Sequence, residues 1–178
     1  KLKLYFRFVV SYSDFKHAHR CTLYSMAEHK KLEKKWGDDL LLRALYSSMV
    51  VAYSRPFNSY GNSQIGKIKP LTVDDLWGLN EKELEIHDYF IYCRNKLIAH
   101  SDAEVVDPLP YVLTGGPKDL ILPVTNDALA PFSKEYTEEM LEYTKRVYHF
   151  AVEEQTRLQI EEEKRLPRDG KEQTVEQK

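Results

Sequence analysis

The chain has 178 residues, a length typical of one globular domain that buries a hydrophobic core of its own. Hydrophobic residues make up 42% and charged residues 30% of it, which favours a folded protein with a polar surface over a disordered one. The formal net charge of −2 excludes binding of a polyanion through overall charge, so any such site must be a local patch.

The opening segment, "KLKLYFRFVVSYS", fits either a strand or the start of a helix. Its basic and then apolar character is that of a signal peptide, but Arg7 interrupts the apolar run and no small-residue cleavage site follows. No apolar run in the chain approaches the ~20 residues of a membrane-spanning helix. We therefore expect a cytoplasmic protein that does not bind a membrane, and the missing initiator Met is expected of a trimmed fragment.

A helix is predicted from about Phe15 to about residue 35, because apolar side chains recur there at the spacing of one helical face. The residues of this face are Phe15, Ala18, Thr22 and Met26. A second helix is predicted to run to about Ser54, capped by Asp38 or Asp39 and stopped before Pro56. This second helix is apolar on nearly all sides, so we expect it to be buried or to lie in an interface.

Residues 57–70 are rich in Gly, Asn and Ser and predict a long loop. A short helical turn capped by Thr72 follows. Asn80 is predicted to cap a third long helix over about 81–101, with Glu81 and Glu83 in its first turn, where the helix dipole favours acidic groups.

Residues 103–130 lose the helical period, and two apolar runs there flank "GGP", a pattern that fits a β-hairpin or an extended excursion. Ser133 is predicted to open the last long helix. The sequence thus predicts an all-α fold: an up-down helical bundle with a long insertion, a β-hairpin or an extended excursion, before the last helix. One domain is expected over 1–166, and the charged residues 167–178 are expected to form a disordered tail.

The third predicted helix presents distinct faces when its residues are placed at helical spacing. One face is apolar and is expected in the core: Ile86, Phe90, Cys93 and Leu97. A neighbouring face mixes apolar and polar side chains: His87, Ile91, Arg94, Ile98 and Ser101. Because burying an unpaired guanidinium costs several kcal/mol, Arg94 must meet a carboxylate, another chain or an anion.

Arg94 and His100 have the chemistry of a site that cleaves RNA. An arginine grips phosphate through a bidentate fork, and a histidine with a pKa near neutral can move a proton. On a straight helix the two residues are separated by about 9 Å of rise and about 120° of rotation, so they do not lie side by side. A two-fold axis between two copies can bring both pairs into one cleft. Asn95 can orient a phosphate or a 2′-hydroxyl, and the 2′-hydroxyl can then attack without a metal.

The stretch "RNKLIAH" resembles the motif of HEPN domains (higher eukaryotes and prokaryotes nucleotide-binding), in which an Arg is followed after four to six residues by a His. The polar Asn95 directly after Arg94 agrees with that motif. The resemblance implies a metal-independent endoribonuclease that works as a homodimer in phage-defence, toxin–antitoxin or RNA-processing systems. It implies Arg94, Asn95 and His100 as catalytic residues, RNA and an antitoxin or other protein as partners, and no metal or cofactor.

Some HEPN proteins bind nucleotides or act as scaffolds without cleaving RNA. A non-catalytic module that binds a nucleotide or a protein is therefore the alternative function. In that case Arg94 and His100 can pair with Asp88, Asp102 or Glu104 in a structural network.

Other basic residues are weaker candidates for RNA contacts. Lys96, on the same face as His100, and Arg55, at a helix end, are candidates for further phosphate contacts. Arg55 can instead stack on a neighbouring aromatic ring, Tyr53 or Phe57. Glu28 and Glu33 reduce the local positive charge of the lysines within residues 30–35, so a solvated face is expected there.

The sequence offers little for a metal site. The "HAH" segment contains His17 and His19, but two residues apart on a helix they point about 200° apart. The cysteines, Cys21 and Cys93, both lie in helical patterns and are expected to be free thiols, neither a disulfide nor a zinc site.

Overall fold

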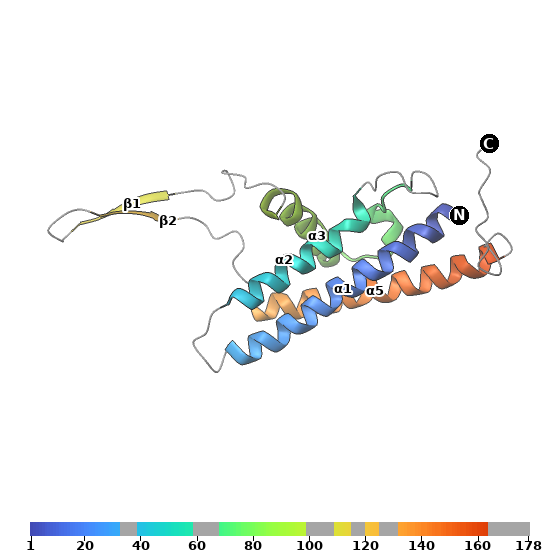
Figure 1. The fold of residues 1–178 in the computed structure, drawn as a ribbon, viewed down its shortest axis with the longest axis horizontal. Helices are drawn as coiled ribbons and strands as arrows, with labels where there is room; N and C mark the ends of the chain where they lie inside the picture. Colours follow the sequence, from blue (N-terminus) through green and yellow to red (C-terminus); the bar gives the residue numbers. More distant parts are fainter. Residues whose placement is uncertain (33–38, 59–67, 99–108, 115–119, 125–131, 164–178) are drawn as a thin grey trace.

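The computed structural model describes residues 1–32, 39–58, 68–98, 109–114, 120–124 and 132–163. Helices dominate this part of the chain, so the predicted all-α class is confirmed. The long helices are α1 (Leu2–Leu32), α2 (Leu40–Ser54), α3 (Glu81–Tyr92) and α5 (Lys134–Glu162). Figure 1 shows α1, α2 and α5 lying side by side, and α3 contacts α2 and α5. Among the described helices, none combines the length and the hydropathy that crossing a membrane requires.

The opening segment, which the sequence left undecided, is the first part of α1. This helix begins at Leu2 and continues without interruption to Leu32, because the run contains neither glycine nor proline. Phe8 and Phe15 are seven residues apart and both are buried, so they continue the predicted face into the opening segment. That face packs against α5 and α2. The predicted helical face from Phe15 to Met26 is confirmed, since all its members are buried.

Helix α2 has the predicted bounds, and within this chain it is buried on only part of its surface. Asp39 occupies the N-cap position without a side-chain cap bond, and its carboxylate instead accepts a hydrogen bond from Arg43 Nε at 2.8 Å. The side chains of Leu40 and Leu41 are 65% and 53% exposed. After Ser54 the chain continues as a 3-10 turn, Arg55–Phe57, where proline ends the α-helix.

The predicted caps of the later helices are confirmed. Thr72 and Asp75 form a capping box around the 3-10 turn Val73–Leu76. Asn80 accepts a hydrogen bond from the Glu83 amide at 3.0 Å, and the Glu83 carboxylate accepts one from the Asn80 amide at 2.9 Å. Each cap satisfies amides at a helix start that have no partner within the helix. The start of α5 is fixed in the same way by Ser133, which accepts from the Tyr136 amide at 3.1 Å.

Two short strands lie within the predicted insertion. They are β1 (Leu109–Leu113) and β2 (Leu120–Val124), and they pair antiparallel with Leu109 opposite Val124. Figure 1 draws both strands apart from the helices. Residues 103–108, 115–119 and 125–130 of this range, and the predicted tail at 167–178, lie outside the described residues.

The apolar spacing of the last helix predicts an inner face of Leu141, Thr144, Tyr148, Ala151 and Leu158, and the buried stripe of α5 is one residue out of phase with part of it. Met140 and Val147 are almost fully buried, whereas Leu141 and Tyr148 are only half-buried. The shift follows from packing, because α5 contacts both α1 and α3 and buries a wider stripe than one partner requires. Glu154 lies on this stripe and is buried as well.

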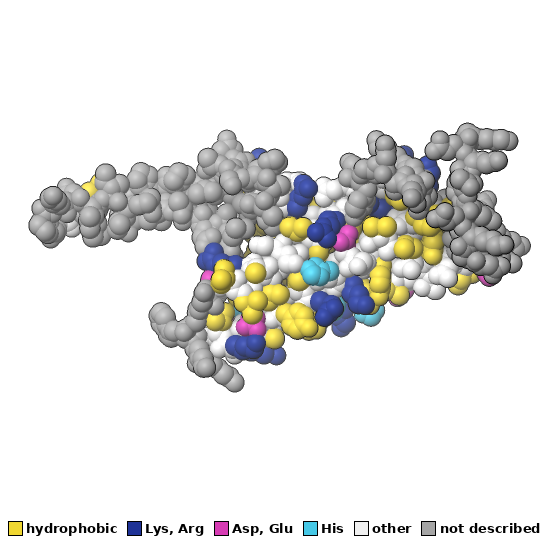
Figure 2. Space-filling model, viewed as in Figure 1, with side chains coloured by type: hydrophobic (Ala, Val, Ile, Leu, Met, Phe, Trp, Pro, Cys, Tyr) yellow, Lys and Arg dark blue, Asp and Glu magenta, His cyan; other side chains and the backbone are white. Residues whose placement is uncertain are grey.

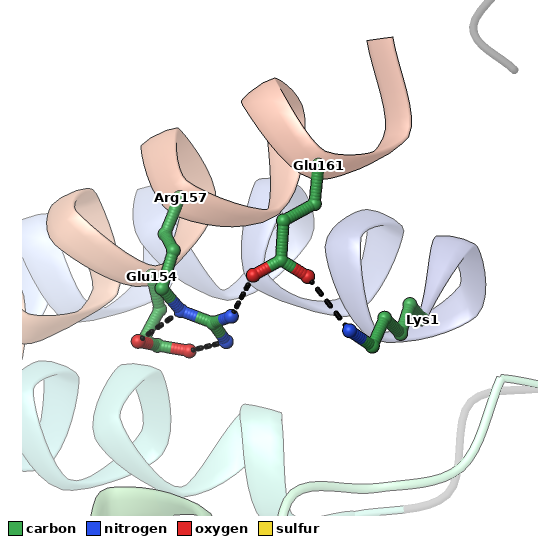
Figure 3. A network of polar contacts seen from close by, with 4 residues as sticks. All are labelled: Lys1, Glu154, Arg157 and Glu161. Carbon is green, nitrogen blue, oxygen red and sulfur yellow. Dashed lines mark hydrogen bonds and ion pairs between the residues drawn. The ribbon is translucent and has the colours of Figure 1, made fainter. Parts of the chain in front are cut away.

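The carboxylate of Glu154 is paired with Arg157 in a polar network at the far end of α5 (Figure 3). Arg157 donates to both oxygens of Glu154, at 2.9 and 2.6 Å, and also pairs with Glu161. Lys1 binds the other oxygen of Glu161 at 3.0 Å and lowers the pKa of that carboxyl group. The ion pair between Lys1 and Glu161 therefore connects the start of α1 with the end of α5.

Candidate functional site

The segment "RNKLIAH" begins on a π-helical turn. Of the helix predicted over 81–101, Glu81–Tyr92 is α-helical and Cys93–Ile98 forms the π-helix η3, while 99–101 lie outside the described residues. Such turns are rare and occur often at functional sites. The local geometry therefore departs from a regular α-helix at Arg94.

The scaffold below this turn is the predicted core face of α3. Ile86, Phe90 and Cys93 are all buried, as predicted, and η3 contacts α2. The hydroxyl of Ser54 on α2 donates to the Phe90 carbonyl at 3.4 Å. Burial raises the pKa of the Cys93 thiol, so this group stays protonated and has a packing role. Both cysteines are free, as predicted.

Arg94 and Asn95 are brought together by this turn. The Arg94 side chain is half-buried, and its Nη1 donates to the Asn95 side-chain oxygen at 2.8 Å. Regular helical spacing had placed the two residues on separate faces. An i→i+5 helix has more residues per turn than an α-helix, so adjacent side chains are separated by a smaller angle. Within the described part of the chain, no carboxylate forms an ion pair with Arg94.

The other predicted site residues do not all join Arg94. His100 lies outside the described residues, as do the suggested network partners Asp102 and Glu104. Lys96 is exposed on η3. Arg55 forms an ion pair with Asp14 of α1, with Nη1 and Oδ1 3.3 Å apart. The guanidinium of Arg55 is therefore held on the α1 side of α2 by a carboxylate, which does not favour a phosphate contact.

A buried hydrogen-bonded network is centred on His87, two helical turns before Arg94. Regular helical spacing puts His87 and Arg94 on the same face. His87 is 7% exposed, and its Nδ1 lies 2.7 Å from the hydroxyl of Tyr53, which also bonds with the hydroxyl of Tyr143. The network joins α2, α3 and α5. Burial lowers the pKa of His87, so the imidazole is neutral at pH 7. Its role is to hold the helix that carries the motif.

The lowered pKa of His87 predicts that the protein loses stability in mild acid. The unfolded chain takes up a proton on this residue near its ordinary pKa of about 6.5, before the folded protein does. The free energy of unfolding should therefore be fully retained above about pH 6.5 and should fall as the pH drops toward the lowered pKa of the folded state. Urea unfolding at a series of pH values measures it. In His87→Gln this fall should shrink, and an unchanged profile would contradict the assignment.

A second polar cluster was missed by the sequence reasoning. His17 Nε2 lies 2.8 Å from the Ser48 hydroxyl and 3.5 Å from the Cys21 sulfur. The signal was the four-residue spacing of His17 and Cys21, which puts both on one helical face. His19 faces α5 instead, so the two histidines point in different directions, as predicted. No group of three or more potential metal ligands occurs among the described residues.

Comparison with models of protein families, with curated proteins and with solved structures finds no match for this chain. The functional argument therefore depends on its own residues.

Proposed function

We propose that the chain is a metal-independent endoribonuclease of HEPN type, built as an up-down helical bundle with an inserted segment and active as a cytoplasmic homodimer. Phage defence or a toxin–antitoxin system is the proposed setting. The observation that carries the proposal is the state of Arg94: a half-buried side chain, oriented by Asn95 on a π-helical turn, with no carboxylate paired to it among the described residues.

Such a guanidinium is suited to an anionic ligand. A half-buried cation gains most from a partner of opposite charge, and a phosphate group accepts two of its hydrogen bonds at once. The bond to Asn95 restricts the guanidinium before any ligand arrives, which reduces the entropy lost on binding. These properties support a role in holding the scissile phosphate.

The proposed reaction needs a proton acceptor as well as this anion site. His100 removes the proton of a ribose 2′-hydroxyl, whose oxygen attacks the adjacent phosphorus. The bond to the 5′-oxygen breaks, and that oxygen takes up a proton. The products are a 2′,3′-cyclic phosphate and a free 5′-hydroxyl. Arg94 stabilises the negative charge on the phosphate oxygens, and a second copy of the chain supplies a second pair of groups to the same cleft.

The test is cleavage of RNA without a metal. The purified 178-residue chain should cut single-stranded RNA in buffer containing EDTA and should leave ends that carry a cyclic phosphate. Gel electrophoresis and mass spectrometry of the fragments measure both features. Cleavage that starts only when a divalent metal is added would contradict the proposal.

A non-catalytic interaction module is the second candidate. The exposed side chains of Leu40 and Leu41 at the start of α2 favour it, because adjacent apolar groups on a surface are typical of a protein contact. This candidate predicts that RNA remains uncut while a protein or a nucleotide is bound.

A further inference from the structure

Charge is distributed unevenly between the two longest helices. In α1 the basic residues outnumber the acidic ones, Asp14 and Glu28. In α5 the acidic residues outnumber the basic ones. Figure 2 shows basic and histidine side chains lying close together over the middle of α1. The protein thus has a local basic face although its net charge is slightly negative.

Aromatic rings lie along the same face, where α1 meets α5. The rings of Tyr12 and Tyr148 are 5.7 Å apart, and the ring of His19 lies parallel to that of Tyr148 at 5.9 Å. The hydroxyl of Thr144 lies 3.5 Å from Nδ1 of His19 and holds that ring in place. All three rings are half-buried, so one part of each packs against the helices and another part faces solvent.

Cations border this row of rings. Lys16 lies 5.5 Å from the centre of the Tyr12 ring, and Arg20 is exposed one turn further along α1. Across the described ranges, neither of them forms an ion pair with a carboxylate. On α5, Lys145 is 3.8 Å from Glu142. Burial, together with the charges of His149 and Lys145, lowers the pKa of His19, which keeps this ring neutral and able to stack.

We propose that the face formed by Tyr12, Lys16, His19, Arg20 and Tyr148, called the α1–α5 surface, binds single-stranded RNA. The choice of RNA rests on the proposed function, but the surface is distinct from the motif. It lies between α1 and α5, whereas η3 contacts α2 and α3. RNA bound here would be held by a second region of the protein during cleavage.

Single-stranded RNA fits these residues better than an acidic protein or a duplex. Unpaired bases expose faces that stack on aromatic rings, and the phosphates are available to lysine and arginine. An acidic protein would use the cations but not the rings. In a duplex the bases are already stacked on one another, so the rings would have no partner.

Charge reversal tests the binding of phosphates. The probe is end-labelled oligouridine, and binding is followed by fluorescence anisotropy at several salt concentrations in EDTA. Lys16→Glu with Arg20→Glu should weaken binding at least tenfold and should reduce the dependence of log affinity on log salt by about 0.7 for each phosphate that is no longer neutralised. The matched control is Lys69→Glu with Lys82→Glu, which changes the net charge equally on other elements and should leave affinity within about twofold.

Ring removal tests stacking separately from charge. Tyr148→Ala should weaken oligouridine binding roughly 5- to 150-fold, which is the usual contribution of one stacked base, without changing the salt dependence. Tyr148→Phe should bind as the unaltered chain does, and thermal unfolding verifies that both variants are folded. The proposal is overturned if the unaltered chain does not bind oligouridine. It is also overturned if both pairs of charge reversals weaken binding equally, or if polyglutamate competes as well as RNA does.

Failure of the surface and failure of the nuclease give different results. If RNA is bound as described but never cut, the proposed function fails and the α1–α5 surface stands. The opposite result is that the double variant Lys16→Glu, Arg20→Glu binds and cuts RNA as well as the unaltered chain does. In that case the surface proposal fails and the nuclease proposal stands.

Discussion

Replacing His100 with alanine is expected to reduce the rate of RNA cleavage by about 10²- to 10⁴-fold, the usual contribution of a general acid or base. The fold should remain intact, because the helix that precedes His100 in the sequence is fixed by Ile86, Phe90 and Cys93 in the core. The rate is measured with labelled single-stranded RNA in EDTA. Circular dichroism and thermal unfolding of the same preparations monitor the fold.

His17→Ala is the matched control, since His17 is an exposed histidine on α1 that bonds with Ser48. It should cleave RNA at the rate of the unaltered protein. Full activity in His100→Ala, or equal losses in both variants, would eliminate the proposed catalytic role of His100.

The Arg94 variants separate charge from geometry. Arg94→Ala should abolish detectable cleavage, and Arg94→Lys should restore only a small part, because an ammonium group cannot make the bidentate contact with phosphate. Asn95→Ala should have a smaller effect, since it removes one hydrogen bond that orients the guanidinium. This order of effects is expected only if Arg94 binds the phosphate directly.

The sequence predicted the helices well where local signals and the core agree. Asn80 and Ser133 cap the helices that follow them, and the apolar stripe from Ile86 to Cys93 faces the core as its spacing requires. These features depend on short stretches of chain. They can be read from neighbouring residues, because the hydrogen bonds and the periodicity are both local.

Features that depend on distant contacts or on unusual backbone geometry could not be predicted. The composition of the first residues of α1 fits a strand as well as a helix, and in the structure they are helical and Phe8 packs on Phe150 of α5, with ring centres 6.0 Å apart. The contact between Arg94 and Asn95 depends on the π-helical turn, and a regular period of 3.6 residues puts them on different faces. The motif was visible in the sequence, but this geometry was not.

The largest loss of stability is expected at Tyr53, whose side chain is fully buried between α2, α3 and α5. Its ring lies 4.9 Å from Phe90 and 5.8 Å from Phe15, centre to centre. Tyr53→Ala should lower the free energy of unfolding by about 3–5 kcal/mol, because it removes a large ring from a packed interior.

Tyr53→Phe keeps the ring and removes only the hydroxyl that bonds with His87 and Tyr143. The expected loss is about 1–3 kcal/mol, the cost of leaving buried polar groups without a partner. Urea unfolding measures both variants, and Tyr24→Ala, at a tyrosine that is 53% exposed, should change stability by no more than about 0.5 kcal/mol. If Tyr53→Phe is as stable as the unaltered chain, the hydrogen bonds of the network contribute nothing to the free energy of unfolding beyond the packing of the ring. In that case the position of α3, and with it the direction of the Arg94 side chain, must be set by the apolar stripe alone.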